Sequence, residues 1–338
     1  MIFGAFWLPG GDISLGKRIA VEAESLGYDF LWTFEQSNWT DVFQEAALIS
    51  TATSKIKLGP ASISPYYRHP VIISGATLTL DKISGGRAIL GVAAGALGGL
   101  KWLGLEYDNF ILRLKETIEI IKKIFTEPEV NYKGKFFTLE KFKFLYMNKP
   151  IEKRAIPVYA SVIGPQMLRM AGEVADGVML MHAPPEYLEI VLKALSRGAE
   201  KKGRNLDEID LHLHMEIFLN EDYDKALKIA KTWLPQVAAV NVEKIGILYE
   251  KCGLTKSEVE LVKKGLKNLP EEVVEKILKG MSILGPAEDC IKRLKEYERN
   301  GVNGIQLNPI THPLHERGKI DRVKGTKLIG EKIIPAFR

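Results

Sequence analysis

Short apolar runs alternate with amphipathic segments along most of the chain. Residues 2–8 (IFGAFWL) are almost wholly apolar and predict a buried strand, whereas residues 14–26 carry apolar side chains at helical spacing. The pattern predicts strands at 2–8, 28–34, from 56 onward, and at 87–92, 156–160, 176–181, 209–219 and 303–307. It predicts the main helices at 14–26, 41–53, 71–83, 109–125, 165–174, 186–202, 223–240, 286–300 and 324–334.

A strand followed by a helix, repeated at this spacing, predicts parallel strands joined by right-handed crossovers. Eight such strands predict an α/β fold, a closed (β/α)8 TIM barrel, with residues 1–338 as a single domain. An open doubly wound sheet is the alternative, but no Gly-x-Gly-x-x-Gly follows the first strand. Two segments interrupt the repeat: a predicted β-hairpin near 129–145 and extra helices near 241–281.

The third strand is interrupted where it ends. Gly59 and Pro60 follow its apolar start, and a run of small residues, 61–64, comes next. Because proline cannot donate to a strand ladder and glycine packs no side chain, we expect the strand to be distorted there. A distorted strand end lets the backbone approach a ligand closely. An ordinary strand exit with turn residues explains the same pattern.

Two other strand exits suit ligand binding, since a barrel binds ligands at the carboxyl ends of its strands. The fourth exit, 91–99, consists of residues so small that it either turns tightly or leaves room for a flat ligand. The fifth leads into a helix beginning at Pro165 or Gln166, and Ser161 and Gly164 leave nearby amides free. Such a helix start attracts phosphate, although an ordinary capped helix fits equally.

A few titratable residues stand at strand exits. Glu35, after the second strand, fits a base, a hydrogen-bond acceptor for a bound ring, or an exposed carboxylate. His182, after the sixth strand, fits ligand contact better than catalysis. His212 and His214 alternate on one strand and share a face, but with no third ligand near them in the sequence. The sequence therefore predicts no metal site.

Composition narrows the classes of function. The 338 residues are 46% hydrophobic and 26% charged, as in ordinary globular proteins, and the net charge of +5 is interspersed with acidic residues. This favours a small-molecule substrate over nucleic acid. The first apolar run reaches Pro9 too early for a signal peptide or a membrane span. Cys252 and Cys290 have no zinc-site or disulfide-framework spacing. We expect a cytoplasmic protein that does not contact membranes.

Several motifs resemble those of one enzyme family. They are Leu58-Gly59-Pro60 with Pro65-Tyr66-x-Arg68-x-Pro70, Gly86-Arg87-Ala88-x-Leu90-Gly91, Gly164-Pro165-x-Met167-Leu168 and Ala171-Gly172-Glu173-x-Ala175-Asp176-Gly177. On these motifs the chain resembles the bacterial-luciferase-like flavin and deazaflavin oxidoreductases over essentially its full length. Within them it is most similar to the archaeal methylenetetrahydromethanopterin reductases, which use coenzyme F420.

The resemblance implies where a cofactor lies. It implies a non-prolyl cis peptide between Ala61 and Ser62, in a bulge that supports the cofactor ring from behind. It also implies that 161–166 meets the cofactor phosphate and that Gly95 and its neighbours follow the ribityl chain. The residues predicted to bind F420, or FMN as the alternative, are Ala61, Ser62, Ile63, Gly95, Ala96, Ser161, Ile163, Gly164, Pro165, Gln166 and His182.

The resulting hypothesis is a coenzyme F420-dependent oxidoreductase. It moves a hydride between the deazaflavin C5 and a small organic or pterin-like substrate, with Glu35 as the catalytic, proton-handling residue. One alternative is an FMN-dependent luciferase-like monooxygenase that uses reduced flavin and oxygen. Another is a non-catalytic flavin-binding homologue, because many relatives carry Asp-His where this chain has Glu35-Gln36, and an acidic residue where it has Phe6. A homodimer is expected by family analogy.

Overall fold

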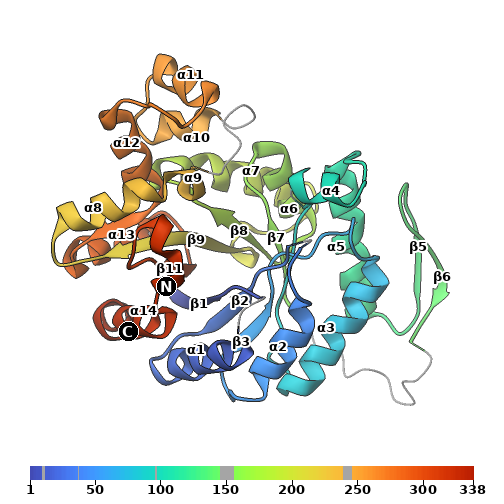
Figure 1. Cartoon of the computed structure of the whole chain (residues 1–338). Coiled ribbons are helices and arrows are strands. Elements are labelled where there is room, and N and C mark those ends of the chain that lie inside the picture. The colour runs from blue at the N-terminus through green and yellow to red at the C-terminus, as the bar shows by residue number, and fades with distance from the viewer. Residues whose placement is uncertain (10–11, 37, 96, 145–155, 239–245) are drawn as a thin grey trace.

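The computed structural model describes residues 1–9, 12–36, 38–95, 97–144, 156–238 and 246–338. Its centre is a ring of eight parallel strands with helices around it (Figure 1), which confirms the predicted (β/α)8 barrel. The strands of the ring are β1 (Ile2–Trp7), β2 (Phe30–Thr33), β3 (Lys57–Pro60), β4 (Leu90–Val92), β7 (Val158–Ser161), β8 (Gly177–Met181), β9 (Asp210–Leu219) and β11 (Gly304–Pro309).

Strand pairing follows the chain order around the ring. The hydrogen-bonded path runs β3-β2-β1-β11-β9-β8-β7-β4, and its pairs are parallel. Two isolated bridges, Leu58 with Ala88 and Ile63 with Val92, join the β3 and β4 segments and close the ring. All eight predicted strands are therefore present, and their carboxyl ends meet at one mouth of the barrel.

Helices surround the ring, most of them on its outside (Figure 1). They are α1 (Ile13–Ser25), α2 (Val42–Ser50), α3 (Pro70–Ser84), α4 (Leu97–Trp102), α5 (Phe110–Thr126), α6 (Pro165–Val174), α7 (Leu188–Glu200), α8 (Tyr223–Thr232), α9 (Leu234–Val237), α10 (Gly246–Lys251), α11 (Lys256–Lys264), α12 (Glu271–Met281), α13 (Ala287–Arg299) and α14 (Arg322–Lys332), with 3-10 turns η1 (Pro185–Tyr187), η2 (Leu206–Glu208), η3 (Leu314–Lys319) and η4 (Ile334–Phe337). Aspartates 12, 41 and 222 cap α1, α2 and α8. No helix in the described ranges combines the length and apolar character needed to cross a bilayer.

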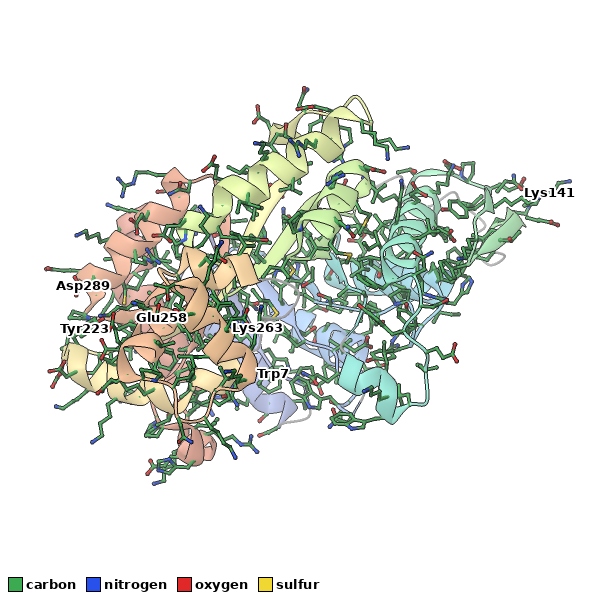
Figure 2. All side chains as sticks on the ribbon, turned by 90° about the horizontal axis from the view of Figure 1, so that it is seen from above. Trp7, Lys141, Tyr223, Glu258, Lys263 and Asp289 are labelled. Carbon is green, nitrogen blue, oxygen red and sulfur yellow. The ribbon has the colours of Figure 1, made fainter. Side chains whose placement is uncertain are left out.

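Both predicted insertions are present. The hairpin consists of the antiparallel strands β5 (Val130–Lys133) and β6 (Thr138–Phe142) and stands to one side of the barrel (Figure 1). In Figure 2, Lys141 of this hairpin lies at one end of the molecule, and Tyr223 and Asp289 lie at the other. The extra helices are α10 to α12. The ends of the two predicted ranges, residues 145 and 241–245, lie outside the described residues.

The structure differs from the sequence prediction in three places. The expected helix 223–240 is two helices, α8 and α9, because Trp233 leaves the helical conformation and Pro235 lies in the first turn of the second helix. The glycine-rich loop after β4 contains the short helix α4. An additional strand, β10 (Ile283–Gly285), pairs with residues 217–219 of β9. Three residues are too few for a periodic pattern to reveal a strand.

Side chains fill the inside of the barrel below its mouth. Gly177 makes room for one of them, since a Cβ there would lie 2.4 Å from the Tyr159 ring, whereas Gly59 lets two backbones approach, since a Cβ there would lie 1.6 Å from the backbone carbonyl oxygen of Ile89. A ligand therefore has to bind at the mouth, where the strand exits meet. The buried interior cluster consists of Phe30, Trp32, Ala61, Ile89, Tyr159 and Met179.

Candidate functional site

The exit of β3 carries the predicted cis peptide, between Ala61 and Ser62. The Ala61 amide donates to the Thr33 carbonyl at 2.6 Å, and the Ile63 amide donates to the Gly91 carbonyl at 2.9 Å. These bonds hold the segment between β2 and β4. Ala61 and Ile63 are buried, whereas Ser62 is partly exposed, so the segment presents backbone and a small side chain to the mouth.

Glycines of the β4 exit let that strand pack close to the β3 exit. A Cβ on Gly91 would lie 2.9 Å from the Ala61 Cβ, and a Cβ on Gly95 would lie 2.8 Å from the Ser64 Oγ. Gly95 also has a φ of +86°, a conformation that other residues rarely adopt. The two exits thus pack into one surface, in which the larger side chains of Ile63 and Val92 are buried. We call this surface, residues 61–64 and 91–95, the shelf.

Glu35 fastens the shelf from the exit of β2. Its Oε1 accepts a hydrogen bond from Arg68 Nε at 3.0 Å, and its Oε2 accepts one from the Ser64 amide at 3.4 Å. Arg68 also donates to Asp41 Oδ2 at 2.8 Å. The Glu35 side chain is only 7% exposed, and this burial raises its pKa although Arg68 acts in the opposite direction. The structure therefore rules out the interpretation of Glu35 as an exposed carboxylate, one of the three that the sequence allowed.

The helix after β7 begins without a side-chain cap. Gly164 is the N-cap residue, and because glycine has no side chain it makes no capping hydrogen bond. The first intrahelical bond runs from the Leu168 amide to the Gly164 carbonyl at 2.9 Å, which leaves the amides of Gln166 and Met167 without a partner in the described part of the chain. A Cβ on Gly164 would meet no atom within 4 Å. The start of α6 thus has free donors, a favourable dipole and room for an anionic group.

A buried imidazole–carboxylate pair lies across the mouth from the shelf strands. His182 directly follows β8 with a φ of +49°, and its Nε2 contacts Glu216 Oε2 of β9. Both side chains are buried. Burial alone would raise the pKa of Glu216, but the neighbouring His182 and His214 lower it to about 2. The carboxylate is therefore ionised.

A second imidazole, His214, lies beside this pair. Its Nδ1 is 3.1 Å from Gln306 Oε1, and burial lowers the pKa of its ring to about 4. The rings of Phe6 and Phe34 pack on His214 with centroid distances of 5.3 and 5.1 Å. Two aromatic rings thus cover His214 beside the pair.

One cation reaches the same region from α14. The Arg322 guanidinium lies 5.1 Å from the centre of the Phe6 ring and donates to Asn308 Oδ1 at 2.8 Å. Burial lowers the pKa of Arg322, while the charge of Glu216 acts to raise it. Its positive charge therefore faces the buried pair without a carboxylate in direct contact among the described residues.

The structure brings the predicted residues together in two groups. Glu35 and the shelf are joined by hydrogen bonds at the exits of β2, β3 and β4, and the 161–166 segment follows at β7, which pairs with β4. His182 belongs to the other group, with Glu216 on β9. Ala96, also predicted to contact the cofactor, lies outside the described residues.

Sequence reasoning missed Glu216 and Arg322. Glu216 continues the alternation of His212 and His214 along β9, so the statement that no third ligand stands near these histidines is wrong. His182, His214 and Glu216 each offer one ligand atom, and these atoms lie within 4.8 Å of one another. No sequence pattern could have placed Arg322 at the mouth, because α14 reaches it only through the tertiary fold.

Comparison with known proteins identifies relatives along the whole chain. A family model described as "Luciferase-like monooxygenase" matches residues 6–304. The chain is 28% identical to a 5,10-methylenetetrahydromethanopterin reductase of Archaeoglobus fulgidus, over 94% of this chain and 93% of that protein. It is 23% identical to an F420-dependent glucose-6-phosphate dehydrogenase of Amycolatopsis mediterranei, over 94% and 93% of the two chains.

Solved structures agree with this comparison. The coenzyme F420-dependent tetrahydromethanopterin reductase of Methanopyrus kandleri superposes with a TM-score of 0.85 at 26% identity, over 100% of this chain and 99% of that chain. An F420-dependent secondary alcohol dehydrogenase in complex with an F420–acetone adduct superposes with a TM-score of 0.79 at 21% identity, over 100% and 99%. The second likeness shows the common fold.

Proposed function

This chain belongs to the luciferase-like monooxygenase family, and from that premise we propose that it is a coenzyme F420-dependent oxidoreductase. The proposed reaction moves a hydride between the deazaflavin C5 and a small organic substrate. The observation that carries the proposal is the shelf, a surface of backbone and small residues beside a helix start with free amides. Relatives whose names state F420 dependence support the choice of cofactor.

The residues at the mouth fit the cofactor they are proposed to hold. Ala61, Ser62 and Ile63 would support the ring, since the shelf offers it no bulky side chain. Gly95 would lie along the ribityl chain. The segment of Ser161, Ile163, Gly164, Pro165 and Gln166 would hold the phosphate, because the first amides of α6 are free and the space at Gly164 is open.

Bound F420 supplies or accepts the hydride, and the protein supplies orientation and proton handling. We propose that Glu35 handles a proton on the cofactor side of the site. Its raised pKa, caused by burial, brings the carboxyl closer to the pH at which such a group exchanges protons. Arg68 limits this rise in pKa through its hydrogen bond to Glu35 Oε1. The hydrogen bond from the Ser64 amide to Glu35 Oε2 keeps the Glu35 side chain oriented toward the shelf.

Cofactor binding tests the proposal first. Purified protein is titrated with F420 and, separately, with FMN, and the fluorescence of each cofactor is followed. We expect saturable binding of F420 and weaker binding of FMN. Tight FMN binding without F420 binding would overturn the cofactor assignment, and oxygen consumption with reduced FMN would then identify a monooxygenase.

Turnover tests the reaction. F420 reduction is followed spectroscopically with 2-propanol and with glucose 6-phosphate, and oxidation of reduced F420 is followed with methylenetetrahydromethanopterin. Cofactor binding without turnover of any of the three would support a non-catalytic homologue. We also propose a homodimer, and light scattering of the eluted protein measures its mass against the 37.8 kDa of one chain.

A further inference from the structure

A buried tyrosine reaches the segment that precedes α6. Tyr187 lies in η1, after β8, and is 0% exposed. Its hydroxyl donates to the Ile163 carbonyl at 2.8 Å. Burial raises the pKa of this phenol to about 12, so at neutral pH the hydroxyl keeps its proton and acts as the donor. The contact therefore joins the loop after β8 to the segment that leaves β7.

Other contacts hold Tyr187 in place. The hydroxyl of Tyr297, which is also buried, donates to the Ala183 carbonyl at 3.0 Å. Pro184 and Pro185 follow, and their rings restrict the backbone that leads to Tyr187. The Tyr187 amide donates to the Pro184 carbonyl at 3.0 Å. Tyr187 is thus a firmly held support, and its hydroxyl meets one particular carbonyl of the neighbouring segment.

The carbonyl that Tyr187 contacts belongs to the same peptide unit as the Gly164 amide. This peptide is trans, and in a trans peptide the C=O and the N–H point in opposite directions. Because the Ile163 carbonyl is turned toward Tyr187, the Gly164 N–H points away from it. This N–H has no hydrogen-bond partner in the described part of the chain. Tyr187 therefore sets the direction of an amide that is available to a ligand.

The hydroxyl also makes this N–H a stronger donor. A hydrogen bond accepted by a carbonyl polarises its peptide unit, and the N–H of the same unit then binds an acceptor more strongly. The Gly164 N–H lies beside the first turn of α6, where the amides of Gln166 and Met167 are also unpartnered among the described residues. The orientation of one peptide thus decides whether the segment presents a donor or a carbonyl oxygen to an anion at this place.

Glycine at position 164 makes the opposite orientation accessible. Turning the Ile163–Gly164 peptide over takes the φ of Gly164 from −78° to a positive value, which glycine adopts readily and other residues rarely adopt. In that orientation the Ile163 carbonyl oxygen would face the ligand and repel an anion. The hydrogen bond from Tyr187 opposes the turn, because the carbonyl would lose its donor.

We propose that Tyr187 is the positioning residue of the cofactor phosphate site, and that its hydroxyl holds the Ile163–Gly164 peptide with the Gly164 N–H turned toward the phosphate. This inference rests on the proposed function. It adds two groups to that site, the Gly164 amide as a donor and a buried tyrosine that acts through it. If the hydroxyl only satisfied a buried carbonyl, its removal would lower stability without discriminating between ligands.

The first test is the affinity of Tyr187→Phe for two ligands, F420 and the deazaflavin riboside, which has the same ring and ribityl chain but no phosphate. The loss of one hydrogen bond to a charged group should raise the Kd for F420 about 10-fold and leave the Kd for the riboside within about twofold of wild type. The matched control is Tyr28→Phe. The buried Tyr28 hydroxyl also donates to a backbone carbonyl, that of Thr326 at 2.9 Å, but it lies before β2, at the opposite end of the barrel, so neither Kd should change.

A second substitution tests the orientation of the peptide itself. Alanine at position 164 disfavours the positive φ that the turned peptide requires. Gly164→Ala in the Tyr187→Phe background should therefore restore most of the lost affinity for F420. A general loss of stability would not be repaired in this way, and circular dichroism shows whether each variant is folded at the temperature of the titration.

The Gly164 amide is also observed without F420. In protein labelled with nitrogen-15 glycine, the signal of residue 164 is identified by its absence in Gly164→Ala. Inorganic phosphate, added at constant pH and ionic strength, should shift this signal in wild type and shift it less in Tyr187→Phe. A signal that phosphate does not move in wild type would overturn the assignment of the Gly164 amide as a donor.

The outcomes separate the inference from the function beneath it. Wild-type protein that does not bind F420 would sink the proposed function, and the phosphate titration would still test the role of Tyr187. Unchanged F420 affinity in Tyr187→Phe, an equal loss for both ligands, or no recovery with Gly164→Ala would overturn the role of Tyr187 while leaving the F420 assignment intact.

Discussion

Replacing Gly164 by aspartate places a carboxylate at the proposed phosphate site. Gly164 has φ −78° and ψ 151°, an extended conformation open to any residue, and a Cβ there meets no atom within 4 Å. The new side chain takes the N-cap position of α6, where it accepts hydrogen bonds from the amides of Gln166 and Met167. Gly164→Asp should therefore fold and should compete with the phosphate for the same donors.

The expected loss of affinity follows from charge. Two unit charges roughly 5 Å apart repel by about 3 kcal/mol at an effective dielectric constant of 20 and by about 1 kcal/mol in water. Because Pro165 and Gln166 are exposed, solvent screens this site and the lower part of the range applies. We expect about 1–2 kcal/mol, which is about a 5- to 30-fold weaker Kd for F420. Aspartate caps a helix better than glycine by a few tenths of a kcal/mol, so Tm should not fall.

The assay is fluorescence titration with two ligands, F420 and the deazaflavin riboside that lacks the phosphate. Gly164→Asp should weaken the binding of F420 and leave the binding of the riboside within about twofold of wild type. Gly164→Ala adds the Cβ without the charge and is the matched control. Unchanged F420 affinity in Gly164→Asp, or an equal loss for both ligands, would refute the assignment of the phosphate to α6.

Three further predictions follow from the described contacts. Arg87 donates to the carbonyls of residues 50, 56 and 84 at 2.7–2.9 Å, so Arg87→Gln should cost about 2–4 kcal/mol in chemical denaturation while the Kd for F420 stays unchanged. Gly95→Ala places a Cβ 2.8 Å from Ser64 Oγ at a φ of +86°, and calorimetry should show weaker F420 binding. Because the pKa of Glu216 is lowered from 4.5 to about 2, its ionised form stabilises the fold above pH 4.5, and this stabilisation is lost as the pH falls toward 2. Circular dichroism between pH 4.5 and 2 should therefore show a shallower loss of stability in Glu216→Gln than in wild type.

The barrel could be predicted because each of its strands has a local sequence pattern. The runs at 2–8 and 209–219 are long and apolar, and the intervening helices carry apolar residues at helical spacing. The break between α8 and α9 has a local cause in Pro235, but the prediction of one helix rested on the spacing of apolar residues and did not take this proline into account. Strand β10 exists because it pairs with β9, and pairing between distant segments leaves no periodic mark in three residues.

One part of the candidate site could likewise be predicted from the sequence, and the other part could not. The shelf was predicted because Gly59, Pro60 and the small residues after them stand together in the sequence, in motifs that resemble those of a family with a known cofactor position. The buried pair was not predicted, because it depends on β8 and β9 lying side by side and on the orientation of His182 after its strand. Burial and hydrogen bonds decide the chemistry of Glu216, and neither is visible in the sequence.

A crystal structure of the protein grown with F420 tests the position of the cofactor most directly. We expect density for the ring against residues 61–64 and density for the phosphate at the amides of Gln166 and Met167. Density for F420 elsewhere on the barrel, or an FMN complex under conditions in which F420 does not bind, would contradict the proposed site.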